Sequence, residues 1–260
     1  MPFNELISEE IYKFDLTNLK ELDQMKLLDR YDCKYVFPSS ILPKLLKELK
    51  NEYNALSINN TRCLQYSNLY YDSPDYALHR MHVNGRKPRF KVRKRNYRVS
   101  NEVFFELKKK NNKSKTEKFR FPVSNEDGQL TEKEMNFLKK HDVKLLDLFP
   151  SIKTIYKRIT LANKNLPEKI TIDFNLEFQS SFATKSIDGL IIAETKNLRS
   201  VHRTFFKSLM KENKIEPYRI SKYCAGAIYT IPDIKYNRYK PKILLINKIC
   251  KNASGIDSRI

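Results

Sequence analysis

Charged and apolar side chains alternate along several stretches of this chain. Within residues 89–95, every second position carries a cation: Arg89, Lys91, Arg93 and Arg95. Phe90 and Val92 lie between these cations. Because alternate side chains of a β-strand point to opposite faces, the segment predicts a strand with one cationic face and one apolar face.

The same alternation recurs in five further segments. They cover residues 30–35, 104–110, 118–121, 169–178 and 190–196. An antiparallel sheet with one face in the core and one in water would explain the pattern in any single strand. Because six segments share it, and like charges on neighbouring strands repel, we favour a sheet that closes into a barrel. The charged faces would then line the interior.

Helices are predicted between these strands. An apolar residue recurs every third position over residues 15–29, and a stripe with i, i+3 and i+4 spacing covers residues 42–53. A capping-box pattern, Thr-x-x-Glu, begins a third helix at Thr131. Ser200 is expected to cap a fourth helix, and a short helix is expected at 221–229. We expect the first helix to pack on the outside of the domain.

Charge narrows the choice of partner. The 260 residues include 50 Lys and Arg against 30 Asp and Glu, which gives a formal net charge of +20. Such an excess favours a polyanion: nucleic acid, polyphosphate, a nucleotide or an anionic membrane. An A/T-rich coding sequence would also raise the lysine content, but it does not explain where the arginines lie.

The predicted interior holds far more cations than carboxylates. Its acidic residues would be Asp32, Glu106, Asp173 and Glu194. Roughly a dozen enclosed cations would each cost several kcal/mol unless paired. An anionic guest that supplies the missing charge resolves this imbalance, and the fork of arginine suits phosphate oxygens.

Other classes of protein fit less well. The N-terminus lacks the layout of a signal peptide, and no apolar run approaches the roughly 20 residues that span a bilayer, so we expect a cytoplasmic protein. Most aromatic residues lie on the faces opposite the cations, which is a core pattern, and we therefore expect no nucleic-acid partner.

The four cysteines have no metal-ligand spacing. With only five glycines, the chain offers no P-loop.

Taken together, the motifs resemble one known family. In chain order they are Arg30-x-Asp32-x-Lys34-Tyr35, Leu69-Tyr70-Tyr71-Asp72-Ser73-Pro74-Asp75, Arg89-x-Lys91-x-Arg93-x-Arg95-x-Tyr97, Glu106-x-Lys108, Lys118-x-Arg120, Tyr156-x-Arg158, Thr171-Ile172-Asp173, Glu194-x-Lys196 and Ser221-Lys222-Tyr223. From about residue 30 to 229, the chain resembles the VTC (vacuolar transporter chaperone) domain of the triphosphate tunnel metalloenzyme superfamily. The resemblance implies an α+β fold: a closed eight-stranded antiparallel β-barrel whose charged lumen binds triphosphate, with helices packed outside.

The resemblance also implies a site. It places phosphate contacts at Lys34, Arg93, Arg95, Lys108, Lys118, Arg158 and Lys222, and a metal-binding carboxylate at Glu194. Of these cations, we expect the catalytic ones to be Lys34, Arg93, Arg95, Arg158 and Lys222. The charged faces add further phosphate-binding candidates: Arg89, Lys91, Arg120 and Lys169. The family commonly has an arginine where Lys169 stands, so a bidentate contact is lost there. Mn²⁺ or Mg²⁺ suits carboxylate ligation.

VTC domains of eukaryotes move the γ-phosphate of ATP onto a growing polyphosphate chain, and we expect the same reaction here, with ATP and polyphosphate as partners. The acceptor phosphate is already ionised, so no strong base is needed. Carboxylates near many cations are weak bases, and the interior lysines and arginines are expected to stay protonated. Two alternatives remain open: a metal-dependent triphosphatase or polyphosphate hydrolase, and a non-enzymatic polyphosphate or nucleotide sensor.

The chain divides into a tunnel domain at 1–235 and a basic C-terminal segment at 236–260. The apolar centre of the second part is Ile243-Leu244-Leu245-Ile246. We interpret this segment either as a final strand or helix of the domain, or as a contact for a membrane surface or a membrane-protein partner.

Overall fold

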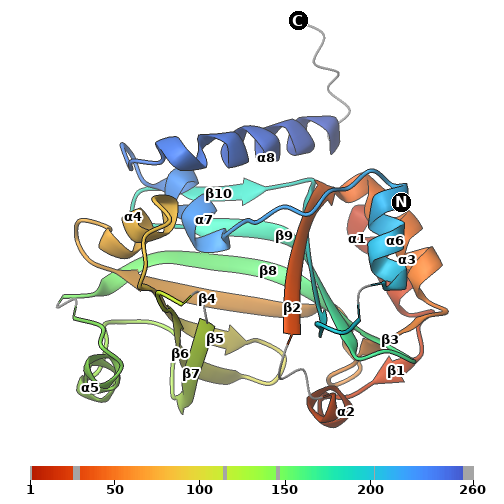
Figure 1. Ribbon diagram of the computed structural model, residues 1–260, viewed down its shortest axis with the longest axis horizontal. Coiled ribbons are helices and arrows are strands. Elements are labelled where there is room, and N and C mark those ends of the chain that lie inside the picture. Colours follow the sequence, from red (N-terminus) through yellow and green to blue (C-terminus); the bar gives the residue numbers. More distant parts are fainter. Residues whose placement is uncertain (1, 26–29, 114–115, 145–146, 202, 254–260) are drawn as a thin grey trace, which may run out of the picture.

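An antiparallel sheet forms the centre of the molecule (Figure 1). The computed structural model describes residues 2–25, 30–113, 116–144, 147–201 and 203–253. Eight strands follow one another across the sheet, each antiparallel to the next. In spatial order they are β2 (Arg30–Pro38), β11 (Leu190–Leu198), β9 (Glu168–Gln179), β8 (Phe149–Asn163), β4 (Leu64–Asp72), β5 (Arg89–Tyr97), β6 (Glu102–Lys110) and β7 (Thr116–Val123).

Short strands and helices surround this sheet. The short strands are β1 (Leu16–Thr17), β3 (Tyr53–Leu56) and β10 (Thr184–Ile187). The helices are α1 (Phe3–Ile11), α2 (Leu19–Gln24), α3 (Leu42–Leu49), α4 (Ala77–Val83), α5 (Glu132–Lys140), α6 (Phe205–Glu212), α7 (Lys222–Thr230) and α8 (Lys240–Ala253). Within the described residues, no helix is both long enough and apolar enough to cross a membrane.

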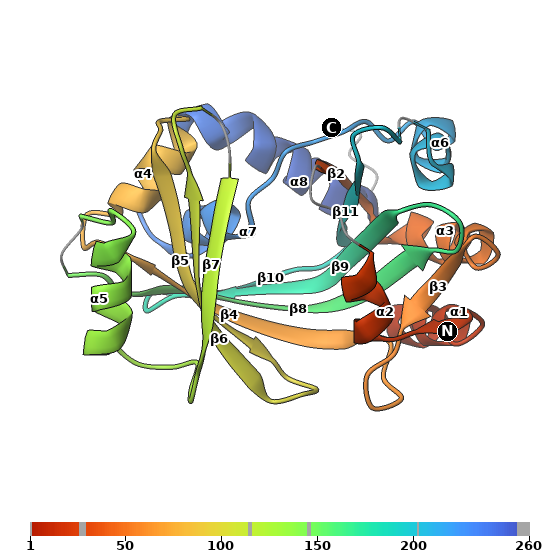
Figure 2. The ribbon, with the colours of Figure 1, turned by 60° about the horizontal axis from the view of Figure 1, so that its bottom comes forward.

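The sheet curls upon itself without closing. Its edge strands β2 and β7 face each other across the molecule (Figure 2), but no ladder joins them within the described residues. The predicted α+β class and antiparallel sheet are confirmed, whereas the predicted closure of the barrel is not found. Residues 217–218 occupy the edge of β2 instead: Pro217 forms a bridge with Tyr35, and the N–H of Tyr218 donates to the carbonyl oxygen of Lys34 at 2.6 Å.

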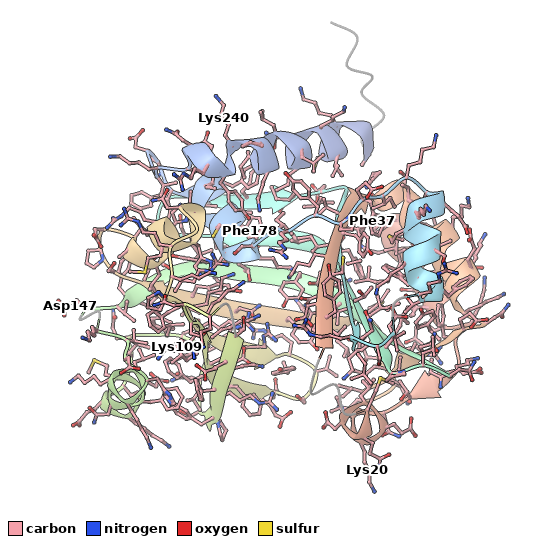
Figure 3. The ribbon with its side chains drawn as sticks, in the orientation of Figure 1. Lys20, Phe37, Lys109, Asp147, Phe178 and Lys240 are labelled. Atoms are coloured by element: carbon pink, nitrogen blue, oxygen red, sulfur yellow. The ribbon has the colours of Figure 1, made fainter. Side chains whose placement is uncertain are left out.

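Apolar side chains fill three layers around the curled sheet. One layer lies under α1, α3 and α6, a second lies under α4 and α5, and a third joins the sheet to α7 and α8. In Figure 3, Phe37 and Phe178 lie inside the molecule, and each is 1% exposed. Lys20 and Lys240 lie at its surface. Helices α1, α3, α4, α5 and α6 therefore cover the outer face of the sheet. Helix α7 packs against its inner face, in a layer that includes Tyr70, Tyr156 and Ile192.

One cation of β5 is buried on the outer face. Lys94 is 1% exposed, and its Nζ lies 3.3 Å from a carboxylate oxygen of Glu134 on α5. Glu134 also accepts the backbone N–H of Thr131 at 2.8 Å in the predicted capping box. A buried cation requires such a partner, because an unpaired charge in this apolar layer would be strongly destabilising. The pair therefore attaches α5 to the middle of β5.

Two predicted helices differ from the structure. The helix expected at 15–29 is shorter, because residues 16–17 form β1 and Asn18 caps α2 through a capping box with Glu21. The end of that prediction, residues 26–29, lies outside the described residues. The helix expected to be capped by Ser200 begins later, at Phe205, because the side chain of Thr204 accepts the N–H of Lys207. The helices predicted at Thr131 and at 221–229 are confirmed.

Candidate functional site

The inward face of the curled sheet encloses a cavity of about 230 Å³, which we call the central cavity. Its lining comes from β2, β4, β5, β6, β7, β8, β11 and the start of α7. The cations that line it are Lys34, Lys91, Arg93, Arg95, Lys108, Lys118, Arg158, Lys196 and Lys222. Three carboxylates share the lining: Asp32, Glu106 and Glu194. Strand alternation brings most of these side chains together, because those on strands lie on the inner faces of their strands. Lys222 comes instead from the first residue of α7.

Glu106 on β6 forms ion pairs with three cations of the two adjacent strands, β5 and β7. Its carboxylate lies 2.6 Å from Arg93, 2.7 Å from Lys118 and 3.8 Å from Arg95. Burial opposes ionisation of Glu106, but these cations outweigh it and hold its pKa well below the usual range. Glu106 is therefore an ionised anchor that orients arginines, and it is a poor proton acceptor.

Asp173 has the same role between β8 and α7. It is 2% exposed and accepts both Nε and Nη2 of Arg158, the latter at 2.8 Å, together with the ammonium of Lys222. Burial raises the pKa of its carboxyl, but the charges of Arg158 and Lys222 prevail and keep it well below normal. A bidentate pair fixes the plane of the guanidinium, so Arg158 is held in one orientation beside the cavity.

Glu194 faces Lys34 on the neighbouring strand. Its oxygens lie 3.4 Å from Lys34 and 2.6 Å from Lys196, and Asp32 lines the same cavity. Burial disfavours its ionisation, yet the two lysines hold the pKa of Glu194 well below its usual value. No group of three or more metal-ligating side chains occurs among the described residues. Two carboxylates, Glu194 and Asp32, in one cavity still fit Mg²⁺ or Mn²⁺, because such ions take one or two protein carboxylates and complete their shell with substrate oxygens and water.

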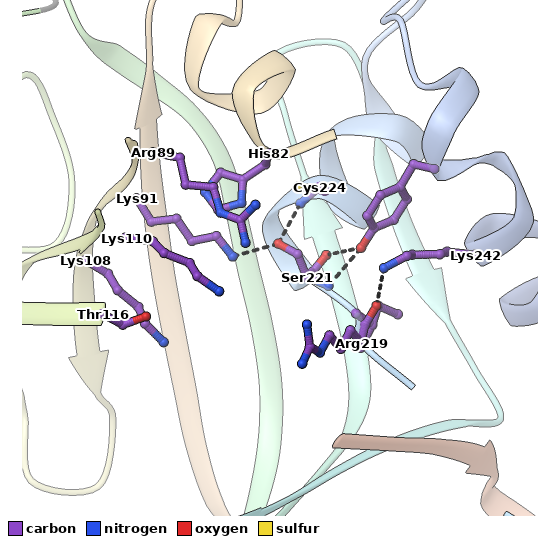
Figure 4. Close-up of a pocket in the computed structure, with 12 residues that line it drawn as sticks. His82, Arg89, Lys91, Lys108, Lys110, Thr116, Arg219, Ser221, Cys224 and Lys242 are labelled. Atoms are coloured by element: carbon purple, nitrogen blue, oxygen red, sulfur yellow. Dashed lines mark hydrogen bonds between the residues drawn. The ribbon is translucent and has the colours of Figure 1, made fainter. Parts of the chain in front are cut away.

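A second cavity, of about 240 Å³, is shown in Figure 4. It adjoins the central cavity, because Lys91, Lys108, Ile220 and Ser221 line both. The cations found only in the second cavity are Arg89, Lys110, Arg219 and Lys242. None of the described residues that line it is a carboxylate. At the junction, the ammonium of Lys91 donates to Ser221 Oγ at 2.9 Å. The two cavities therefore adjoin each other, and cations line both.

The sequence match decides the family. The model of the VTC domain family matches residues 29–231, most of the chain. The chain belongs to the VTC domain family. The resemblance drawn from the motifs is thereby confirmed, and a role that involves triphosphate or polyphosphate agrees with the cationic cavities.

One solved structure supports the fold of this VTC domain. A candidate adenylate cyclase from Bacillus halodurans has a TM-score of 0.50 at 12% identity, and the match covers 74% of this chain and 94% of that one. A candidate adenylyl cyclase from Hippeastrum, described as having a dominant triphosphatase activity, gives 0.49 at 12% identity, with 81% and 100% covered. At these identities the likeness concerns the fold alone. No curated protein sequence matches the chain.

The structure gathers nearly all the residues singled out from sequence. Arg89 lies in the second cavity only, and Glu194 and eight of the cations line the central one. Two cations lie in neither cavity: Lys169 donates to the carbonyl oxygen of Leu22 at 3.4 Å, and Arg120 lies over the ring of Phe104 at 4.8 Å.

Sequence reasoning missed several lining residues of this VTC domain. Lys196 belongs to a motif already noted, and its place two residues after Glu194 on the same face would have identified it. Tyr156 also lines the central cavity; burial raises the pKa of its hydroxyl, but Arg158 and Arg95 bring it down to about 8. Arg219 and Lys242 come from a loop and from α8, where no periodic pattern marks them.

Lys91 differs from the expectation that every interior lysine stays charged. Burial, helped by the neighbouring cations Lys108 and Lys34, lowers its pKa to about 7. Burial likewise lowers the pKa of Lys108 to about 8. Near neutral pH, Lys91 is therefore only partly protonated in the absence of an anion, and a bound phosphate would draw a proton onto it.

This linkage predicts a pH dependence of phosphate binding. Phosphate favours the protonated amine, so affinity is greatest below the pKa of free Lys91 and falls above pH 7, by up to about tenfold per pH unit. In Lys91→Arg the cation stays charged, and we expect a shallower fall between pH 7 and 9. Calorimetric titration with inorganic triphosphate at constant salt measures both slopes. The ionisation of triphosphate itself is the same for both proteins, so equal slopes would contradict the assignment.

Proposed function

We propose that this VTC domain is a polyphosphate polymerase that transfers the γ-phosphate of ATP to a growing polyphosphate chain. The observation that carries the proposal is the second cavity. It adjoins the central cavity, cations line it, and none of its described lining residues is a carboxylate. These properties suit the binding of a second phosphate chain end to end with the donor.

Three carboxylates in or beside the central cavity support transfer to phosphate over transfer to water. Glu106 and Glu194 line the cavity and Asp173 lies beside it; each lies against two or three cations, and their pKa values are held low. None of them is suited to remove a proton from water near neutral pH. The terminal oxygen of a polyphosphate chain is already anionic, so it attacks without a base.

In the proposed mechanism, the cations position the donor and stabilise the charge that spreads over the transferred phosphoryl group. Arg93 and Arg158, oriented by Glu106 and Asp173, would bind donor oxygens, together with Lys34, Arg95 and Lys222. A divalent cation bound by Glu194 and Asp32 would neutralise part of the charge on the phosphates. Lys91, Lys108 and Lys118 would hold the acceptor end at the junction with the second cavity.

Hydrolysis of triphosphate is the second candidate, and one observation favours it. The pKa of Lys91 is about 7, so its amine could accept a proton from water near neutral pH. In that reaction, the site proposed for the acceptor chain would instead hold the water molecule that attacks the triphosphate.

Product analysis separates the two reactions. Purified protein is incubated with ATP and Mn²⁺, with and without a short polyphosphate primer, and the products are resolved on a gel. We expect a ladder of chains and extension of the primer. Orthophosphate and nucleoside diphosphate without any chains would favour the hydrolase. Tight binding of ATP without turnover would instead make the protein a sensor.

A further inference from the structure

The inner face of the β5–β6–β7 ladder changes character from one end to the other. Its rows of paired side chains, in order, are Arg89, Lys110 and Thr116; Lys91, Lys108 and Lys118; Arg93, Glu106 and Arg120; Arg95, Phe104 and Pro122; and finally Tyr97 and Glu102. Cations dominate the first rows and aromatic rings the last. In Figure 2, the aromatic end lies at the hairpin between β5 and β6, away from α4 and α8.

The rings at this end form a connected cluster on the inner face. Tyr97 lies edge-on to Tyr66 at 5.1 Å and to Phe104 at 5.8 Å, and Tyr66 stacks on Tyr156 at 5.6 Å. Tyr97 and Phe104 are only half-buried. The guanidinium of the exposed Arg120 lies 4.8 Å from the centroid of the Phe104 ring.

The cluster adjoins the phosphate-binding cations directly. Arg95 is the ladder partner of Phe104, its guanidinium lies 6.0 Å from the ring of Tyr97, and it also lines the central cavity. A nucleotide joins a polyanion to an aromatic base. The cationic region of the inner face would match the polyanion, and the adjoining aromatic cluster would match the base. Partly exposed rings beside an arginine are suited to stack a base.

We infer that the two cavities have a direction: the nucleoside of the donor binds over Tyr97, Phe104 and Arg120, its triphosphate lies in the central cavity, and the polyphosphate chain extends into the second cavity along Arg89, Lys110 and Arg219. The inference rests on the proposed function for the identity of the donor and acceptor. It adds a nucleoside subsite and assigns opposite ends of the path to donor and product.

Binding of three ligands tests this direction. Calorimetry at one salt concentration, with a chelator present to prevent turnover, compares inorganic triphosphate, ATP and a linear polyphosphate of moderate length. Phe104→Leu and Tyr97→Leu remove the rings but retain apolar volume. Lys110→Ala and Arg219→Ala remove cations of the second cavity alone. Thermal unfolding of each variant verifies that it folds.

We expect the aromatic variants to weaken ATP binding by about tenfold, since base stacking accounts for affinity of that order, and to leave triphosphate binding unchanged. We expect the second-cavity variants to weaken polyphosphate binding only. Equal losses for ATP and triphosphate, an unchanged ATP affinity in the aromatic variants, or a loss of ATP binding in the second-cavity variants would each overturn the direction. If the native protein binds none of the three ligands, the proposed function itself fails. Binding without polymer formation leaves the direction standing and refutes the polymerase.

Discussion

Replacing Arg158 with alanine is expected to lower polymer synthesis by about 100- to 1,000-fold, the loss typical of removing one fixed group that stabilises transition-state charge. The guanidinium lines the central cavity and is held by two bonds to Asp173. Its loss leaves that buried carboxylate paired with Lys222 and removes a positive charge from the cavity where phosphate should bind. Breaking such a pair also costs roughly 3–5 kcal/mol of folding free energy.

Urea unfolding measures the loss of stability, and gel quantification of the polyphosphate formed as ADP is released measures the loss of polymer synthesis. Arg158→Lys keeps the positive charge but loses the fork, so we expect it to fold more stably than the alanine variant while turnover remains low. Lys157→Ala provides the matched control, because Lys157 precedes Arg158 on β8 and lines neither cavity. Near-native turnover in a folded Arg158→Ala protein would show that Arg158 does not contribute to catalysis.

The second large effect is expected at Glu194. Glu194→Gln should reduce Mn²⁺-dependent turnover by about 100-fold or more, because a neutral amide is a poor ligand for a hard divalent cation. Triphosphate binding without metal should be retained or become tighter, since Lys34 and Lys196 lose the carboxylate that now pairs with them. The change therefore separates metal binding from phosphate binding.

Manganese titrations of activity, together with calorimetry in chelator, give both quantities. Glu177→Gln on the neighbouring strand β9 is the control, because Glu177 lines neither cavity. Full metal-dependent activity in Glu194→Gln would show that another carboxylate binds the metal. A parallel loss of metal-free triphosphate binding would show that Glu194 supports the fold of the cavity instead.

Strand alternation made most of the central cavity predictable. In β5 and β6 the inner and outer faces follow directly from the spacing of Arg93, Arg95, Glu106 and Lys108, and the structure places all four in the cavity. Lys94 breaks the rule of an apolar outer face, and its pairing with Glu134 could not be foreseen, because it depends on where α5 packs.

Features that depend on tertiary packing were beyond the sequence pattern. The cations Arg219 and Lys242 reach the second cavity from a loop and from α8, and neither lies in a periodic segment. The missing contact between β2 and β7 also depends on tertiary packing. Alternation predicts a charged face on β2, but it does not predict whether β7 or the segment at 217–218 pairs with the edge of β2.

The pairing of Lys94 with Glu134 also bears on how the chain avoids misfolding. Residues 93–95 are all cations, so charge at these three positions alone would not distinguish the native alignment of β5 from one displaced by a single residue. A displacement of that kind exchanges the two faces of a strand. It would put Phe90 and Val92 into the cavity, while Arg93 and Arg95 would enter an apolar layer whose carboxylate is already positioned for one lysine. Glu134 can pair with one cation there, so the displaced alignment leaves the other arginine unpaired in the apolar layer. This cost, together with the exposure of Phe90 and Val92 to the cavity, favours the native alignment.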